Sequence, residues 1–167
     1  MSTRTLILLR HAKAEPEGDH GDADRPLAAR GRRQCGLIGP QLAGAVGAVD
    51  LVLVSSALRT TQTYELIAPD LEVRAHETRA EIYDAGPRDL LSLLREVDPE
   101  AGTVLVVGHE PTMSGTASLL HDARDDLAKQ VSLGISTASA CVLDVPGAWA
   151  ELDRSTAHLR QILRPGE

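Results

Sequence analysis

Three short apolar runs limit the fold of this 167-residue chain more than any other feature of its sequence. They cover residues 6–9, 50–54 and 103–107, where leucine, isoleucine and valine follow one another almost without interruption. A strand with one face in water alternates polar and apolar residues, whereas these runs are apolar on both faces. The runs therefore predict strands that are covered on both sides. Each run is far shorter than a membrane span, which needs about 18 apolar residues.

Helical patterns separate the apolar runs, because apolar residues recur there at helical spacing. The predicted helices cover residues 27–45, a segment that ends near residue 68, and residues 87–97 and 113–120. Weaker patterns predict strands at 71–75, 139–145 and 150–152, an irregular stretch at 77–86, and a strand or a helix at 158–163. This alternation predicts an α/β fold, a three-layer sandwich whose central, mostly parallel sheet carries helices on both faces. The length fits a single domain over residues 1–167.

Each of the three runs ends at polar or glycine residues. The pairs that follow the runs are Arg10-His11, Ser55-Ser56 and Gly108-His109. In mostly parallel sheets, ligands bind beyond the carboxyl ends of the strands. The three pairs are therefore expected to converge on one crevice.

Two histidines together with arginines favour an anionic ligand. A catalytic zinc site normally has three protein ligands, and neither His11 nor His109 has further ligands at a suitable spacing. Guanidinium groups match phosphate oxygens and stay charged at any working pH. Arg59 is expected in the first turn of a helix, where the dipole disfavours a cation unless an anion lies in front of it. We therefore predict a site for an anionic group such as a phosphate, to which zinc is a poor fit, and no cofactor.

Composition excludes several classes of partner. Lysine and arginine total 17 against 24 acidic residues, which gives a net charge of −7, and aromatic residues make up only 2% of the chain. Both values argue against nucleic-acid binding, which relies on basic clusters and stacking side chains. Cys35 and Cys141 fit no metal-ligand spacing and are expected to be small core residues of a reduced protein. The apolar stretch at residues 1–9 is too short for a secretory signal, so we expect a cytoplasmic protein without membrane attachment.

Three motifs resemble those of the histidine phosphatase superfamily, whose fold is that of phosphoglycerate mutase. Residues 8–12 (Leu-Leu-Arg-His-Ala) look like its Arg-His-Gly/Ala signature. Residues 55–63 (Ser-Ser-Ala-Leu-Arg-Thr-Thr-Gln-Thr) are similar to its Ser-x-x-x-Arg-x-x-Gln-Thr block, and residues 107–111 (Val-Gly-His-Glu-Pro) match its Gly-His block. Order and spacing agree over roughly residues 5–120. The short length and residues 10–14 and 24–27 further resemble the SixA-type phosphohistidine phosphatases.

The resemblance implies a role for each motif residue. His11 would attack phosphorus through a neutral imidazole nitrogen, giving a phosphohistidine that water then hydrolyses. Arg10, Arg59 and His109 would hold the phosphoryl oxygens and stabilise their charge without a metal ion. The SixA-type resemblance implies a histidine-phosphorylated protein as substrate. The alternatives are a phosphatase of small phosphate esters, a phosphoglycerate mutase-like enzyme and, outside enzymes, a phosphate-sensing signalling module.

Two further residues have alternative roles. Glu81 lies where the superfamily usually supplies a carboxylic acid that protonates the leaving group, but it can equally be a solvated loop carboxylate. Arg25 follows an acidic, turn-rich loop and either binds substrate or pairs with Asp22 or Asp24.

Overall fold

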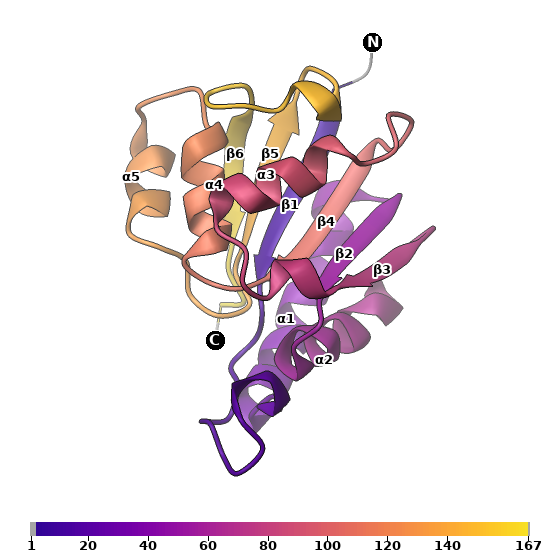
Figure 1. The fold of residues 1–167 in the computed structure, drawn as a ribbon, viewed down its shortest axis with the longest axis vertical. Coiled ribbons are helices and arrows are strands. Elements are labelled where there is room, and N and C mark those ends of the chain that lie inside the picture. The colour runs from indigo at the N-terminus through magenta and orange to yellow at the C-terminus, as the bar shows by residue number, and fades with distance from the viewer. Residues whose placement is uncertain (1–2, 167) are drawn as a thin grey trace.

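One mixed sheet forms the centre of the computed structural model, which describes residues 3–166 (Figure 1). Its strands are β1 (Arg4–Arg10), β2 (Leu51–Ser55), β3 (His76–Arg79), β4 (Thr103–Gly108), β5 (Ala140–Val145) and β6 (His158–Leu163). The strand order is β3-β2-β4-β1-β5-β6. The first four strands in that order are parallel, whereas β5 runs antiparallel to β1 and β6 antiparallel to β5. The predicted α/β fold with a mostly parallel sheet is confirmed.

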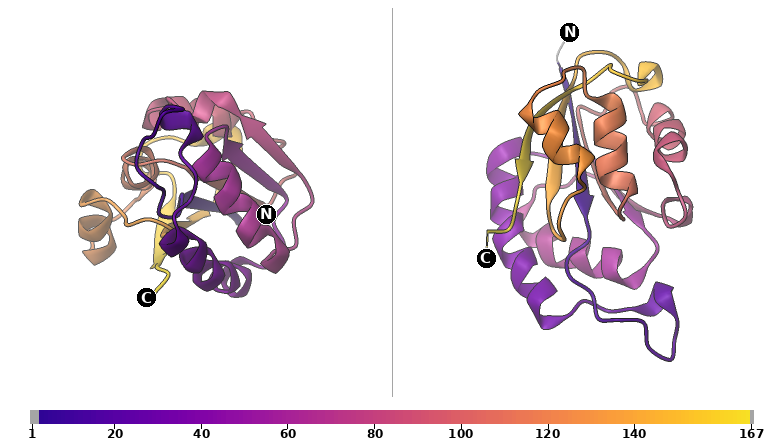
Figure 2. Two further views of the ribbon diagram at one scale, coloured as in Figure 1. Left: turned by 90° about the horizontal axis from the view of Figure 1, so that it is seen from below. Right: turned by 90° about the vertical axis from the view of Figure 1, so that its left-hand side faces the viewer.

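Helices cover both faces of this sheet (Figures 1 and 2). One face carries α1 (Ala29–Val46) and α2 (Leu58–Ile67), and the other carries α3 (Pro87–Arg95), α4 (Thr112–Leu120) and α5 (Asp126–Ser132). In β1, Leu6 and Leu8 pack into the core between the sheet and α3, α4 and α5. Ile7 and Leu9 pack into the core between the sheet and α1 and α2. All four side chains are buried, which is why this run of the sequence is continuously apolar. None of the described helices is long and apolar enough to cross a membrane.

The two cysteines lie in different cores, as expected for small apolar residues. Cys35 is a residue of α1 and Cys141 a residue of β5, and both are buried, free thiols. Burial raises the pKa of Cys35 to about 11 and that of Cys141 to about 12. Neither thiol is therefore a reactive thiolate near neutral pH.

Three weaker predictions were wrong. The strand predicted at 71–75 instead covers His76–Arg79, within the stretch expected to be irregular. It is a polar edge strand paired only with β2 among the described residues, so it lacks the apolar pattern of a buried strand. The strand predicted at 150–152 is a 3-10 turn over Trp149–Glu151, which lets the Trp149 indole donate to the carbonyl oxygen of Ala101 at 2.7 Å. Helix α5 was not predicted, because its seven residues bury only one side chain.

Gly31 is required where α1 meets the segment that follows β1. A Cβ atom on Gly31 would overlap the backbone carbonyl oxygen of Lys13, which also accepts the Ala28 N–H at 2.9 Å. We therefore expect Gly31→Ala to lower the free energy of unfolding by about 1–3 kcal/mol, measured by urea denaturation. Gly36→Ala on the same helix is the matched control, because a Cβ there meets no described atom within 4 Å. It should raise stability by about 0.5–1 kcal/mol, and equal losses in both variants would contradict this account.

Candidate active site

The carboxyl ends of β1, β2 and β4 bring two histidines and a serine together. His11 follows β1, and its backbone N–H donates to the carbonyl oxygen of Gly108 at the end of β4 at 3.0 Å. The rings of His11 and His109 lie 5.5 Å apart between centroids. Ser55, at the end of β2, lies with its Oγ 2.7 Å from Nε2 of His109. The convergence predicted from the ends of the apolar runs is present in the structure.

His11 is held as a neutral imidazole with one free nitrogen. Its Nδ1 lies 2.7 Å from the carbonyl oxygen of Ala12, which can only accept, so Nδ1 carries the hydrogen and Nε2 keeps its lone pair. The pKa of His11 is lowered to about 3, chiefly by burial and also by the neighbouring His109, Arg59 and Arg10, against the hydrogen bond to Ala12. His11 therefore stays a neutral imidazole with an unprotonated Nε2 throughout the neutral range.

The hydrogen bonds of Ser55 orient His109. The Ser55 hydroxyl accepts the Ala57 N–H at 3.4 Å, so its own hydrogen is available to Nε2 of His109. In the tautomer in which Ser55 donates to Nε2, and in the imidazolium, Nδ1 of His109 is an N–H donor. Burial lowers the pKa of His109 to about 4, and Arg59 and Arg10 contribute in the same direction. A bound phosphoryl group would oppose this effect and raise the pKa, because negative charge favours the imidazolium.

The two buried histidines make stability depend on pH. In the unfolded chain their pKa is near 6.5, against about 3 and about 4 in the folded protein. Between these values the unfolded state binds more protons, so stability falls as the pH drops from 6.5 toward 4. We expect His11→Asn to show a shallower fall in melting temperature over this range than the wild type. Parallel curves for the two proteins would contradict the low pKa of His11.

The two arginines of the site donate hydrogen bonds from outer nitrogens, whereas the Nε of each has no partner among the described residues. Arg10 donates from Nη1 to the carbonyl oxygen of Ile135 at 2.9 Å. Arg59 donates from Nη1 and Nη2 to Asp22, at 2.9 Å to its carbonyl oxygen and 3.1 Å to its carboxylate. Both Nε atoms, and Nδ1 of His109, are buried with no hydrogen-bond partner among the described residues. Unsatisfied buried donors are costly, and three in one site fit an anion with several acceptor oxygens.

Sequence reasoning missed Asp22 and Tyr83. The Tyr83 hydroxyl donates to the Asp22 carboxylate, and the Tyr83 ring packs edge-on against His109 with centroids 5.6 Å apart. Arg25 also donates to this carboxylate, at 3.1 Å, so the predicted pairing of Arg25 with Asp22 is present. Arg25 is thus connected to the site by its hydrogen bond to Asp22. The only signal in the sequence was the acidic, turn-rich loop itself, which does not single out one carboxylate.

Glu81 has no described contact with this cluster, and its surroundings are those of the solvated loop carboxylate that the sequence left as one of two alternatives. Its carboxylate is exposed and pairs with Arg79 at 2.7 Å. The hydrogen bond from Arg79 lowers the pKa of Glu81, so the side chain holds no proton at neutral pH. Arg79 lies only two residues away at the end of β3, so this pairing is local.

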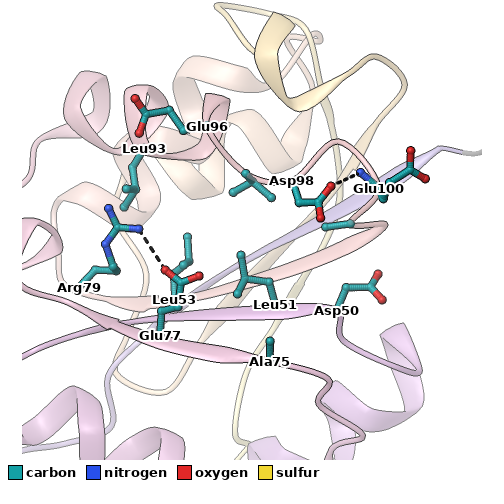
Figure 3. Close-up of a pocket in the computed structure, with 12 residues that line it drawn as sticks. Asp50, Leu51, Leu53, Ala75, Glu77, Arg79, Leu93, Glu96, Asp98 and Glu100 are labelled. Carbon is teal, nitrogen blue, oxygen red and sulfur yellow. Dashed lines mark hydrogen bonds and ion pairs between the residues drawn. The ribbon is translucent and has the colours of Figure 1, made fainter.

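A separate cavity of about 440 Å³ lies at the β3 edge of the sheet (Figure 3). Leu51 and Leu53 form part of its floor, and Glu77 and Arg79 pair across one end at 3.2 Å. Neither histidine of the site lines this cavity.

Within residues 3–166, one group of side chains has the proximity required of metal ligands, namely His121, Asp122 and His158. Both ring nitrogens of His121 are already used, because Nδ1 accepts the Leu159 N–H at 2.9 Å and Nε2 lies 2.9 Å from the Asp125 carboxylate. A metal ion would have to displace the bond from Leu159. The group therefore fits a structural hydrogen-bond network rather than a metal site.

Comparison with known proteins identifies the family. Residues 6–85 match the histidine phosphatase superfamily, branch 1. The structure of a candidate phosphohistidine phosphatase SixA from Nakamurella multipartitia is 34% identical, with a TM-score of 0.86 over 100% of this chain and 99% of that one. The chain belongs to the histidine phosphatase superfamily. Within the superfamily it is a member of the SixA-type branch.

Two other proteins are similar to this chain. An uncharacterized protein of Mycobacterium tuberculosis is 37% identical over 154 residues, which cover 90% of this chain and 96% of the relative. The protein histidine phosphatase SixA complexed with tungstate is 22% identical, with a TM-score of 0.74 over 96% of this chain and 97% of that one. That likeness shows a shared fold.

Proposed function

We propose that this histidine phosphatase is a metal-independent phosphohistidine phosphatase that acts on a histidine-phosphorylated protein through a covalent intermediate on His11. One observation carries the proposal. The free Nε2 of His11 lies in a cluster with three buried donors, Arg10 Nε, Arg59 Nε and His109 Nδ1, that have no partner among the described residues. These donors and two guanidinium charges match a phosphoryl group and stabilise the charge on its oxygens in the transition state.

The reaction proceeds in two displacements at phosphorus. First, the Nε2 lone pair of His11 attacks phosphorus, and the bond from phosphorus to the substrate imidazole breaks as the bond to Nε2 forms. The departing imidazole keeps the electron pair of the broken bond and takes its proton from water. Second, water attacks phosphorus, the bond to Nε2 breaks, and inorganic phosphate leaves with His11 restored to its neutral form.

The lack of a proton donor for the leaving group favours a phosphoramidate over an ester as the substrate. An alkyl phosphate ester leaves as an alkoxide and needs a proton donor in the site. The Asp22 carboxyl has a pKa well below its usual range, because Tyr83, Arg25 and Arg59 donate hydrogen bonds to it. Glu81 is paired with Arg79 and is also ionised. Neither carboxylate supplies a proton at neutral pH, whereas the imidazole of a phosphohistidine takes its proton from water on its other ring nitrogen and leaves as a neutral group.

Phosphate release with EDTA present, on two substrates, tests this proposal. We expect the wild type to prefer a histidine-phosphorylated protein over an alkyl ester such as glycerol 1-phosphate, and Glu81→Gln to keep that preference and that rate. A preference for the ester, lost in Glu81→Gln, would instead support an ester phosphatase with Glu81 as its acid. Transfer of the phosphoryl group to a second substrate molecule, rather than to water, would support the mutase alternative. Binding of phosphate without turnover of either substrate would support a sensing module.

A further inference from the structure

The Asp22 carboxylate covers Arg59 on the solvent side of the site. The side chain of Asp22 is 41% exposed, whereas that of Arg59 beneath it is only 8% exposed. Asp22 belongs to a 3-10 turn over Asp22–Asp24, in the loop between β1 and α1 that extends beyond the carboxyl end of the sheet (Figure 1). The Ala14 bridge to Leu27 and a 2.8 Å hydrogen bond from the Glu15 N–H to the Pro26 carbonyl oxygen close the base of this loop.

Three side chains fix the position of this carboxylate. Arg59 and Arg25 each donate to it at 3.1 Å, and the Tyr83 hydroxyl donates to the same oxygen as Arg59. Arg25 is itself anchored, because its Nε donates to the carbonyl oxygen of Glu15 at 2.8 Å. The pKa of Asp22 lies well below its usual range for the same reasons, so the carboxylate is charged at neutral pH.

A substrate must extend past this charge. Its phosphoryl group reaches the buried Nε atom of Arg59 and the rest of the molecule extends toward solvent, where Asp22 lies. The outer nitrogens of Arg59 are already bonded to Asp22. A second anionic group on the substrate would therefore meet a fixed like charge, and specificity commonly arises from such repulsion.

We propose that Asp22 is a specificity-determining residue that rejects substrates with a second anionic group beside the transferred phosphoryl group and accepts neutral or cationic leaving groups. This inference rests on the proposed function, because it names the leaving groups that the same site takes. A histidine side chain, neutral or protonated, belongs to the accepted class. Phosphorylated hydroxy acids, which carry a carboxylate, belong to the rejected class.

Two esters of the same shape and different charge test the proposal. They are 4-carboxyphenyl phosphate and 4-carbamoylphenyl phosphate, which differ only in a carboxylate against an amide. The measured quantity is the ratio of their kcat/KM values, with the ratio of their dissociation constants measured by calorimetry as a second readout. We expect Asp22→Asn to shift both ratios by about 5- to 10-fold in favour of the carboxylate ester.

Three control variants distinguish an effect of the Asp22 charge from an effect of altered structure at the site. Asp22→Glu keeps the charge, so its ratios should stay those of the wild type even where both rates fall. Tyr83→Phe removes one donor to Asp22 and should lower both rates together. Asp24→Asn removes an equal charge from an exposed position in the same turn and should leave the ratios unchanged.

The possible results also separate this inference from the proposed function. If the esters are turned over and Asp22→Asn leaves both ratios unchanged, the specificity role of Asp22 is overturned. The proposed phosphatase activity then still stands. Binding of both esters without turnover leaves the proposed function to its own test with the histidine-phosphorylated protein, while the dissociation constants still decide the role of Asp22. Equal shifts in Asp22→Asn and Asp24→Asn would mean a general effect of net charge and would also overturn the proposal.

Discussion

Replacing His11 by asparagine is expected to lower the rate of phosphate release by about 10⁴-fold or more. The variant keeps a side chain of similar polarity but loses the Nε2 lone pair, which the hydrogen bond of Nδ1 to Ala12 leaves free in the wild type. Without it no covalent intermediate forms, and only water held by the same donors remains to attack phosphorus. The rate should be measured with a histidine-phosphorylated protein in the presence of EDTA.

His20→Asn is the matched control for this variant. His20 lies exposed in the loop after β1 and takes no part in the cluster, so its replacement should leave the rate unchanged. The melting temperature of His11→Asn must show a folded protein at the assay pH. Wild-type activity in folded His11→Asn would rule out His11 as the nucleophile.

The second large effect is expected at Arg59, where alanine should lower kcat/KM by about 10²- to 10³-fold. Arg59 offers the site a buried Nε donor and a full positive charge, and its outer nitrogens are already bonded to Asp22. Lysine restores the charge without the planar donor group, so Arg59→Lys should recover only part of the loss.

Arg33→Ala serves as the control for Arg59, because Arg33 is an exposed arginine on α1. It removes the same charge from the protein and should leave kcat/KM unchanged. Full recovery of activity in Arg59→Lys would mean that charge alone matters and would contradict the role given to the Nε donor.

The sequence allowed prediction of those site residues that follow directly from the ends of buried strands. A buried strand is recognisable from its apolar run, and the direction of a parallel strand determines where its next residue lies. Arg10, His11 and His109 were located in this way, and the structure brings them together. Arg59 follows β2 by only a few residues, so the same reasoning extends to it.

Residues that reach the site from loops and edges were not predictable in this way. Asp22 arrives through a loop whose path depends on contacts with Arg59 and Tyr83, which are 37 and 61 residues away in sequence. The polar strand β3 and the short helix α5 lack the apolar periodicity on which such predictions depend. For Glu81 the sequence left two alternatives, and the pairing with Arg79 gives it the surroundings of a solvated loop carboxylate.

Direct detection of the covalent intermediate tests the central claim that His11 carries the phosphoryl group. The protein would be mixed with a histidine-phosphorylated substrate, quenched within milliseconds in alkali, digested and analysed by mass spectrometry. We predict one added phosphoryl group on the peptide that contains His11, stable in alkali and lost in acid, and absent from His11→Asn. A phosphoryl group on another residue, or rapid release of phosphate with no labelled His11 at any time, would contradict this account.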